Sequence, residues 1–284
     1  MVIVLAITGA TGAIGGRVAR QLAHLDPVLV VRDASRAPDL GCEVRAASYG
    51  DRAAADAALA GAKTLLLVSA AESATRREEH RTMIEAAADA GVRHLVYTSF
   101  AGAAPDATFT LGRDHWDAEQ AIRAAAERTG LGYTLLRDSF YADVLPEFAD
   151  PMGVIRGPAG TGRVAAVARA DVADAAVAVL TAPEAHAAAT YLLTGPEALT
   201  LEEAAARAGA VLGRSLRYEE ETVEEAYASR RAAYPGAADW QLDAWVSTYT
   251  AIAEGSVADV TTDVERLTGH PARTLEQALG ALSR

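Results

Sequence analysis

The sequence predicts an α/β fold in which a doubly wound parallel sheet is joined by a smaller, mainly helical C-terminal region. Short apolar runs alternate five times with helix-like stretches over residues 2–98, and the connections are short. This rhythm is typical of parallel strands with helices on both faces. The first run leads into a glycine-rich turn at residues 8–15, directly before an alanine-rich stretch. A strand, a glycine turn and a helix in this order indicate a Rossmann-like nucleotide-binding fold.

Five short, largely apolar runs in the first half of the chain are expected to be strands, because buried parallel strands read as continuous runs of Val, Ile and Leu. Residues 42–46 are expected to be a weaker strand. Amphipathic stretches between them are expected to be helices. Asp51 fits the N-cap of one helix, since its carboxylate can accept the first free N–H groups. The expected strands are residues 2–7, 28–31, 42–46, 64–68, 94–98 and 133–137, and the expected helices are residues 14–25, 51–60, 75–90 and 113–128.

The second half of the chain is less regular. Residues 146–162 are rich in Pro and Gly and lack periodicity, so we expect a loop or a mobile segment there. Thr200 and Glu203 have the spacing of a capping box, and Asp171 is expected to cap another helix. The remaining expected elements are strands at 164–168 and 191–194, helices at 171–180 and 199–212, and a mainly helical segment at 217–284.

These elements predict a nucleotide-binding core and a second region. Residues 1–145 are expected to form the core. Residues 164–195 are expected to add further strands and a helix to it. Residues 146–163 and 196–284 are expected to form a substrate-side region. The length of 284 residues fits one large domain or a domain with a smaller appendage.

Composition and charge exclude several classes of protein. The net charge is −12 and there is no basic run, which disfavours nucleic acid or an anionic membrane as a partner. A single cysteine, Cys42, rules out an intramolecular disulfide and a cysteine-rich metal site, and we expect no metal. Neither a basic signal-peptide start nor an apolar run of about 20 residues is present. We therefore expect a cytoplasmic protein with a small-molecule substrate, and a homodimer is an open alternative.

The glycines of the first turn have separate tasks in a nucleotide-binding fold. Gly9 permits the tight turn, Gly12 leaves room for a pyrophosphate, and Gly15 lets the helix pack close to the strand. The start of the helix then offers free N–H groups to the phosphates. A tight turn that binds nothing is the alternative interpretation. The expected cofactor contacts here are Gly9, Thr11, Gly12, Ala13, Ile14 and Gly15.

Two arginines follow the second expected strand, where NAD-specific sites carry an acidic residue for the ribose 2′-hydroxyl. Arg32 can pair with a 2′-phosphate, and Arg36 is a second candidate partner. Asp33 stands next to Arg32, so the pattern is mixed. We favour NADP over NAD as the cofactor and keep a solvated strand end as the alternative for Arg32.

Several stretches together resemble one family. The sequence is similar to the atypical short-chain dehydrogenase/reductases, in particular the NmrA-like branch and its type-2 NAD(P)H:quinone oxidoreductases. The resemblance implies a Rossmann-like domain with a small C-terminal substrate region and a nicotinamide cofactor, usually NADPH. The matching stretches are ITGATGAIG at 7–15, VVRDASRA at 30–37, LLLVSAAE at 65–72, HLVYTSFAGA at 94–103, RDHWDAEQAI at 113–122, YTLLRDSFY at 133–141, ARADVADAAVAVL at 168–180 and YLLTGPEALTLEEAA at 191–205.

The resemblance also implies roles for residues that follow the strands, at the edge where such sheets bind ligands. Ser69 and Ala70 are expected beside the cofactor ribose, and Thr98 and Ser99 beside the nicotinamide. A plain strand-end cap is the alternative for Ser99. The residues expected to contact the substrate are Phe100, His115, Trp116, Glu119, Phe140 and Tyr141.

The chain lacks the lysine chemistry of its relatives. Its one lysine, Lys63, has Leu59 four residues before it, which excludes the Tyr-x-x-x-Lys pair of typical short-chain dehydrogenases. The lysine of the ether-cleaving branch is also absent, and Glu119 falls near its position. His115 and Glu119 are four residues apart on one helical face, so His115 is a candidate proton donor or substrate contact held by Glu119. The alternative is an ion pair at the surface or behind the residues that touch the substrate.

Tyr141 is the other candidate donor, or alternatively an aromatic pocket wall, and Ser99 completes the candidate catalytic residues. We expect an NADPH-dependent reductase that transfers hydride to a quinone-like or conjugated carbonyl compound. Protonation would come from solvent, His115 or Tyr141, and most of the rate from positioning. The alternatives are a non-catalytic NADP(H)-binding redox sensor that acts on a partner protein, and a cofactor-dependent isomerase, epimerase or lyase.

Overall fold

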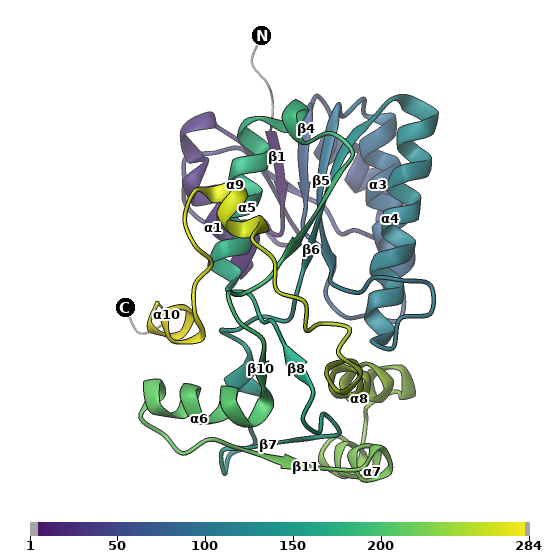
Figure 1. Cartoon of the computed structure of the whole chain (residues 1–284). Coiled ribbons are helices and arrows are strands. Elements are labelled where there is room, and N and C mark those ends of the chain that lie inside the picture. The colour runs from purple at the N-terminus through teal and green to yellow at the C-terminus, as the bar shows by residue number, and fades with distance from the viewer. Residues whose placement is uncertain (1–4, 282–284) are drawn as a thin grey trace. The chain divides into compact units, whose positions relative to one another are not determined.

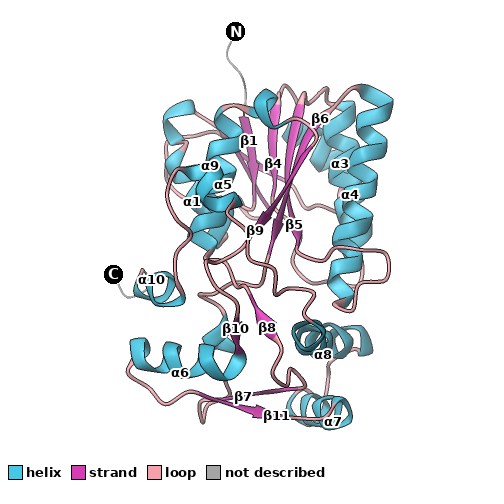
Figure 2. Ribbon diagram, in the orientation of Figure 1, coloured by secondary structure: helices cyan, strands magenta, loops and turns pink. Residues whose placement is uncertain are grey.

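The computed structural model describes residues 5–281, which form two compact units (Figures 1 and 2). The first, which we call the sheet unit, contains the chain up to Ser99 together with Asp114–Arg137 and Val172–Tyr191. The second, which we call the C-terminal unit, contains Phe100–Arg113, Asp138–Asp171 and the chain from Leu192 onward.

A seven-stranded sheet forms the centre of the first unit, with strand order β3-β2-β1-β4-β5-β6-β9. The pairs β1–β2, β2–β3, β1–β4 and β4–β5 are parallel, and Ala6 lies opposite both Val28 and Leu65. The strand order reverses between β1 and β4, which makes their carboxyl ends the topological switch point. The strands are β1 (Leu5–Thr8), β2 (Val28–Val31), β3 (Val44–Ala46), β4 (Thr64–Leu67), β5 (His94–Phe100), β6 (Gly132–Asp138) and β9 (Ala189–Leu193).

Helices cover both faces of this sheet, so the predicted fold class is confirmed. Figure 1 shows α3 and α4 along one face and α1 and α5 along the other. Every residue of β1, β2 and β4 is buried, as the continuous apolar runs predict. Asp51 caps α2 as expected, and its carboxylate accepts a hydrogen bond from Ala54 N at 3.0 Å. The helices are α1 (Ala13–Gln21), α2 (Arg52–Leu59), α3 (Arg76–Asp89), α4 (Thr110–Thr129) and α5 (Arg169–Thr181).

The C-terminal unit combines helices with two pairs of short strands. β7 (Val154–Gly157) pairs in parallel with β11 (Arg217–Glu220), and β8 (Arg163–Val164) pairs antiparallel with β10 (Leu199–Thr200). The predicted capping box is confirmed, since Thr200 Oγ1 accepts from Glu203 N and Glu203 accepts from Thr200 N. The helices are α6 (Leu201–Leu212), α7 (Val223–Ala233), α8 (Asp239–Glu254), α9 (Asp263–Thr268) and α10 (Leu275–Gly280).

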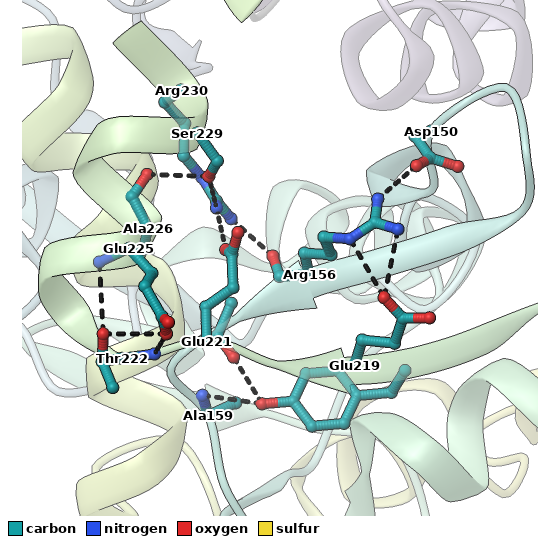
Figure 3. Close-up of polar contacts among 12 residues, drawn as sticks. Asp150, Arg156, Ala159, Glu219, Glu221, Thr222, Glu225, Ala226, Ser229 and Arg230 are labelled. Carbon is teal, nitrogen blue, oxygen red and sulfur yellow. Dashed lines mark hydrogen bonds and ion pairs between the residues drawn. The ribbon is translucent and has the colours of Figure 1, made fainter. Parts of the chain in front are cut away.

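Residues 146–162, expected to be a loop, contain a 3₁₀ helix (Leu145–Phe148) and β7, so that prediction is wrong. Side chains hold β7 to β11 (Figure 3). Arg156 Nε donates to Glu219 at 3.1 Å, and Arg230 Nη2 donates to the carbonyl oxygen of Arg156 at 2.5 Å. The Tyr218 hydroxyl donates to the carbonyl oxygen of Gly157 at 2.5 Å. These contacts bring together segments far apart in the chain, which local periodicity does not reveal.

Other expectations about the second half also need correction. Residues 217–220 are a strand and not helical, because they pair with β7. Asp171 lies inside α5, and its carboxylate accepts from Arg273 N at 2.8 Å instead of capping the helix. Of the strand expected at 164–168, only Val164 is in a strand. The parts of the expected elements that fall on residues 1–4 and 282–284 lie outside the described residues.

None of the helices within residues 5–281 has the length and apolar character needed to cross a membrane.

Candidate functional site

The glycine turn lies at the carboxyl end of β1, beside the end of β4. Gly9 has φ +63°, and a Cβ there would lie 3.2 Å from the Cβ of Val68. A Cβ on Gly15 would lie only 2.4 Å from the carbonyl oxygen of Gly9 and 2.6 Å from that of Thr8. Gly15 therefore lets α1 pack directly on the turn, and Gly9 allows a left-handed backbone where little room exists.

The start of α1 is open. Gly12 is the N-cap and has no side chain to accept from the helix, and Gly16 N makes the first intrahelical hydrogen bond, to Gly12 O at 3.0 Å. The N–H groups of Ala13, Ile14 and Gly15 precede that bond and lack helical partners. A Cβ on Gly12 would meet only Gly9 O, at 3.3 Å. These features fit the pyrophosphate of a dinucleotide.

The end of β2 presents positive charge. Arg32 and Arg36 are exposed, and neither has an ion-pair partner among residues 5–281. The Asp33 carboxylate instead accepts from Ser35 Oγ at 2.7 Å and Ser35 N at 3.0 Å, which caps the short 3₁₀ helix Ala34–Arg36. These hydrogen bonds lower the pKa of Asp33. The acidic side chain is therefore used locally, whereas both guanidinium groups face solvent.

Tyr49 joins the two strands at the switch point, a role that the sequence did not reveal. Its hydroxyl lies 2.6 Å from the carbonyl oxygen of Val68 and 2.5 Å from Thr8 Oγ1, and Thr8 Oγ1 accepts from Val68 N at 2.9 Å. A carbonyl can only accept, so Tyr49 donates to Val68 and the Thr8 hydroxyl donates to Tyr49. Burial raises the pKa of Tyr49. The turn after β1 and the segment after β4 are thereby held together.

Ala70, predicted to lie beside the cofactor, is held on both sides by side chains of α3. Its N–H donates to His80 Nε2 at 2.8 Å, and its carbonyl accepts from Arg76 Nε at 3.0 Å. Arg76 is 4% exposed and His80 is fully buried. Ser69 N donates to Thr98 Oγ1 at 2.8 Å. Arg76 and His80 are four residues apart on one helical face, which is the signal that could have identified them.

His115 is buried, and both ring nitrogens are engaged within the sheet unit. Its Nε2 lies 3.0 Å from Arg76 Nη2, and its Nδ1 lies 3.0 Å from the Tyr97 hydroxyl. A guanidinium can only donate, so Nε2 is the acceptor and Nδ1 of the neutral ring carries the hydrogen. Burial, and then the positive charge of Arg76, lower the pKa of His115 well below its ordinary value. His115 is therefore a neutral imidazole in this structure.

Glu119 is fully buried and contacts Ser99, another predicted site residue. Ser99 Oγ donates to Glu119 Oε1 at 2.7 Å. Arg137 binds the same carboxylate through two hydrogen bonds, of 2.8 and 2.7 Å, and Arg123 lies at 3.3 Å. Arg137 comes from β6 and was not among the predicted residues. The Glu119 carboxylate therefore pairs with the guanidinium groups of Arg137 and Arg123, and it orients the Ser99 hydroxyl.

The predicted residues after β6 belong to the C-terminal unit. The Tyr141 hydroxyl lies 3.1 Å from Asp138 Oδ2, and Asp138 is 1% exposed. Phe100, Phe109 and Phe140 form a compact aromatic cluster in the same unit, with ring centroids 4.7, 5.0 and 5.2 Å apart. Phe109 was not predicted. Trp116 lies half-buried on α4 of the sheet unit.

Comparisons with known proteins agree with this geometry. A family model described as NAD(P)H-binding matches residues 9–183. Quinone oxidoreductase 2 of Escherichia coli strain K12 is 33% identical over 288 residues, covering 98% of each chain. A (4-alkanoyl-5-oxo-2,5-dihydrofuran-3-yl)methyl phosphate reductase of Streptomyces griseus is 37% identical over 277 residues, covering 94% of this chain and 93% of the relative. The crystal structure of the NADPH-dependent E. coli quinone oxidoreductase complexed with NADPH has a TM-score of 0.85 at 33% identity, covering 99% of this chain and 100% of that chain.

The sheet order, the glycine turn and the open start of α1 define a dinucleotide-binding protein of the Rossmann class. The chain belongs to the NAD(P)H-binding family. The resemblance to the NmrA-like branch and its quinone oxidoreductases is confirmed.

Proposed function

We propose that the protein is an NADPH-dependent reductase whose acceptor is a quinone-like or conjugated carbonyl compound. The observation that carries the proposal is the uncapped start of α1 behind the turn from Gly9 to Gly15, at the switch point of a parallel sheet. The relatives support the same reaction class, because they are a quinone oxidoreductase and a second reductase.

The chain offers groups for each part of the cofactor, which supplies a hydride when it is bound. The N–H groups of Ala13 and Ile14, which lack helical partners, would bind the pyrophosphate. Arg32 and Arg36 are exposed for a 2′-phosphate. Ser69, Ala70, Thr98 and Ser99 lie after β4 and at the end of β5, at the carboxyl edge of the sheet where ligands bind in this class of fold.

The acceptor is expected to use the aromatic side chains at the end of β5 and after β6. Phe100 and Phe140 form part of the aromatic cluster, and Tyr141 adds a hydroxyl. Flat conjugated rings pack well against such side chains. His115 and Trp116 remain predicted contacts of the acceptor. The rate would come mainly from holding the acceptor and the hydride donor in a reactive geometry.

The proposal is tested by mixing the purified protein with NADPH and a panel of quinones, conjugated enones and lactones, and following the absorbance of the reduced nicotinamide. Oxidation of NADPH that depends on both the protein and an acceptor is expected. Absence of turnover with every acceptor would contradict the reductase proposal.

A redox sensor is the second candidate, and one observation favours it: the polar groups of Ser99 and His115 are engaged by neighbouring side chains of the same unit. A sensor must bind the oxidised and reduced cofactor with different affinities, because a ligand shifts an equilibrium only through differential binding. Titration with NADP⁺ and NADPH measures this directly. A clear difference in Kd without turnover would favour the sensor.

Replacing Arg32 or Arg36 by serine is expected to weaken NADPH binding about tenfold each, through loss of roughly 1.4 kcal/mol of charge-assisted hydrogen bonding. NADH lacks the 2′-phosphate, so its Kd should stay within about twofold of the wild-type value. Titration of the nicotinamide fluorescence measures both constants. Arg93→Ser is the matched control, since Arg93 is exposed directly before the amino end of β5. Equal weakening of NADPH and NADH would refute this role of the arginines.

A further inference from the structure

The connection after β3 reaches the switch point of the sheet. Tyr49 follows β3, which is separated from β4 by β2 and β1 in the order of the sheet. Its hydroxyl nevertheless contacts Thr8, at the end of β1, and Val68, directly after β4. All three residues belong to the sheet unit. Since ligands of such sheets bind beside the switch point, Tyr49 lies next to the place where a dinucleotide is expected.

Three hydrogen bonds between Thr8, Tyr49 and Val68 form a closed loop, which we call the hydrogen-bond ring. The Val68 N–H donates to Thr8 Oγ1 at 2.9 Å, and the Thr8 hydroxyl donates to that of Tyr49 at 2.5 Å. The Tyr49 hydroxyl donates to the carbonyl oxygen of Val68 at 2.6 Å, so each of the three hydrogens has its own acceptor. Linked hydrogen bonds of this kind polarise one another. Both backbone polar groups of Val68 are therefore held by side chains from other segments.

Val68 packs directly on the glycine turn. A Cβ on Gly9 would lie 3.2 Å from the Cβ of Val68, 3.4 Å from its Cγ1 and 3.5 Å from its Cγ2. The carbonyl oxygen of Gly9 accepts from Gly12 N at 2.8 Å, which closes the turn before α1. A displacement of Val68 would therefore change the space above Gly9 and move the N–H groups at the start of α1.

The aromatic part of Tyr49 has a separate task. It is half-buried and packs against the hydrophobic core of the sheet unit. A phenylalanine would fill this place equally well, because it has the same ring. The hydroxyl is therefore the part of the side chain that only the hydrogen-bond ring requires, and its removal tests the ring without emptying the core.

We propose that Tyr49 is a positioning residue for the cofactor: its hydroxyl holds Val68 on the glycine turn and keeps the start of α1 in the geometry that binds the pyrophosphate. The inference rests on the cofactor binding in the proposed function, and it does not depend on which acceptor is reduced. Tyr49 acts before any turnover. It lowers the conformational freedom that the turn would otherwise lose when the cofactor binds.

Tyr49→Phe is expected to raise the Kd for NADPH about fivefold, because the carbonyl of Val68 loses its donor and the hydroxyl of Thr8 loses its acceptor. Fluorescence titration with NADPH measures the Kd. Tyr133→Phe is the matched control. Tyr133 is half-buried against the same core, and its hydroxyl makes no hydrogen bond within residues 5–281. An unchanged Kd in Tyr49→Phe, or an equal rise in the control, overturns the proposal.

Thr8 separates an effect of the hydrogen-bond ring from a direct contact between Tyr49 and the cofactor. The side chain of Thr8 is fully buried, so it is shielded from a bound cofactor. Thr8→Val keeps nearly the same shape without a hydroxyl and should also raise the Kd for NADPH about fivefold. Thr8→Ser keeps the hydroxyl and should stay within about twofold of the wild-type value. Equal losses in the two Thr8 variants would show that only packing matters and would overturn the proposal.

The double variant with Tyr49→Phe and Thr8→Val tests whether the two hydroxyls act together. Both changes remove the hydrogen bond between Thr8 and Tyr49, so their effects should not be independent. The Kd for NADPH is expected to rise by clearly less than the product of the two single increases. A rise equal to that product would mean that the two residues act separately, which contradicts the hydrogen-bond ring.

A measurement on the cofactor-free protein separates this inference from the reductase proposal. Amide hydrogen exchange reports local opening of the backbone. In Tyr49→Phe, exchange is expected to be about fivefold faster at the amides of Val68 and Gly12 and unchanged along β6. Unchanged exchange at Val68 and Gly12 overturns the role of Tyr49 even if the wild type reduces quinones. Faster exchange together with the raised Kd supports that role even without quinone reduction, and the reductase proposal alone then fails.

Discussion

Gly15→Ala is expected to abolish detectable NADPH binding and to destabilise the fold. The new Cβ would lie 2.4 Å from the carbonyl oxygen of Gly9 and 2.6 Å from that of Thr8. Both neighbours are backbone atoms that cannot rotate away, so α1 must separate from the turn. Overpacking of this kind costs about 1–3 kcal/mol. Thermal unfolding followed by circular dichroism and titration with NADPH measure the two effects.

Two other glycines separate folding from binding. Gly50→Ala is the control for stability, because the nearest atom to its Cβ would be Glu79 Cγ at 3.7 Å. Gly12→Ala should fold, since its Cβ would meet only Gly9 O at 3.3 Å, but it should weaken NADPH binding by filling space needed for the pyrophosphate. Wild-type NADPH affinity in Gly15→Ala would show that close packing of α1 on the turn is unimportant.

Arg76→Met is expected to raise the Kd for NADPH roughly 10- to 30-fold, through loss of about 1.4–2 kcal/mol of hydrogen bonding from a buried cation. The methionine keeps much of the volume but leaves the carbonyl of Ala70 and the Nε2 of His115 without their donor. The segment after β4 then loses one of the two side-chain contacts that hold Ala70, and the contact with His80 remains. Fluorescence titration with NADPH gives the Kd, and steady-state kinetics show whether KM rises more than kcat falls.

Arg77→Met is the matched control for this change. Arg77 is the next residue and donates to Asp114 at 2.6 Å, and Arg76 also lies 3.6 Å from that carboxylate. The side chain of Arg77 is 46% exposed, whereas that of Arg76 is 5% exposed and also contacts Ala70. Arg77→Met should therefore leave the Kd for NADPH nearly unchanged. Equal losses in the two variants would indicate a general charge effect and not an ordered segment after β4.

The parts of the fold that the sequence predicts correctly depend on local signals. Each of these signals is formed by residues only a few positions apart in the chain. They are the cap at Asp51, the capping box of Thr200 and Glu203, and the glycine turn. The pairing of β7 with β11 joins Val154 to Arg217, and neither segment has a pattern that identifies its partner. Long-range pairing of short strands is therefore the part that sequence periodicity does not show.

The same difference between local signals and long-range contacts applies to the candidate site. The sequence identifies residues at strand ends, because parallel strands place those ends at one edge. It does not identify what contacts them. Helical spacing predicts that Glu119 holds His115, but the carboxylate binds Arg137 of β6 and Ser99 of β5. On a helix that faces a sheet, side chains from the strands compete with the neighbour four residues away, and sequence spacing carries no information about them.

The position of Lys63 has a practical consequence for attaching the protein to a surface or a dye. Lys63 directly precedes β4, and its ammonium lies 3.5 Å from the carbonyl oxygen of Gly91, in the connection to β5. It is the only lysine in the 284-residue sequence. Parallel strands begin at one edge of a sheet and end at the other. Amine-reactive coupling through Lys63 will therefore anchor the edge where β4 and β5 begin and leave the glycine turn free for cofactor in biosensor measurements.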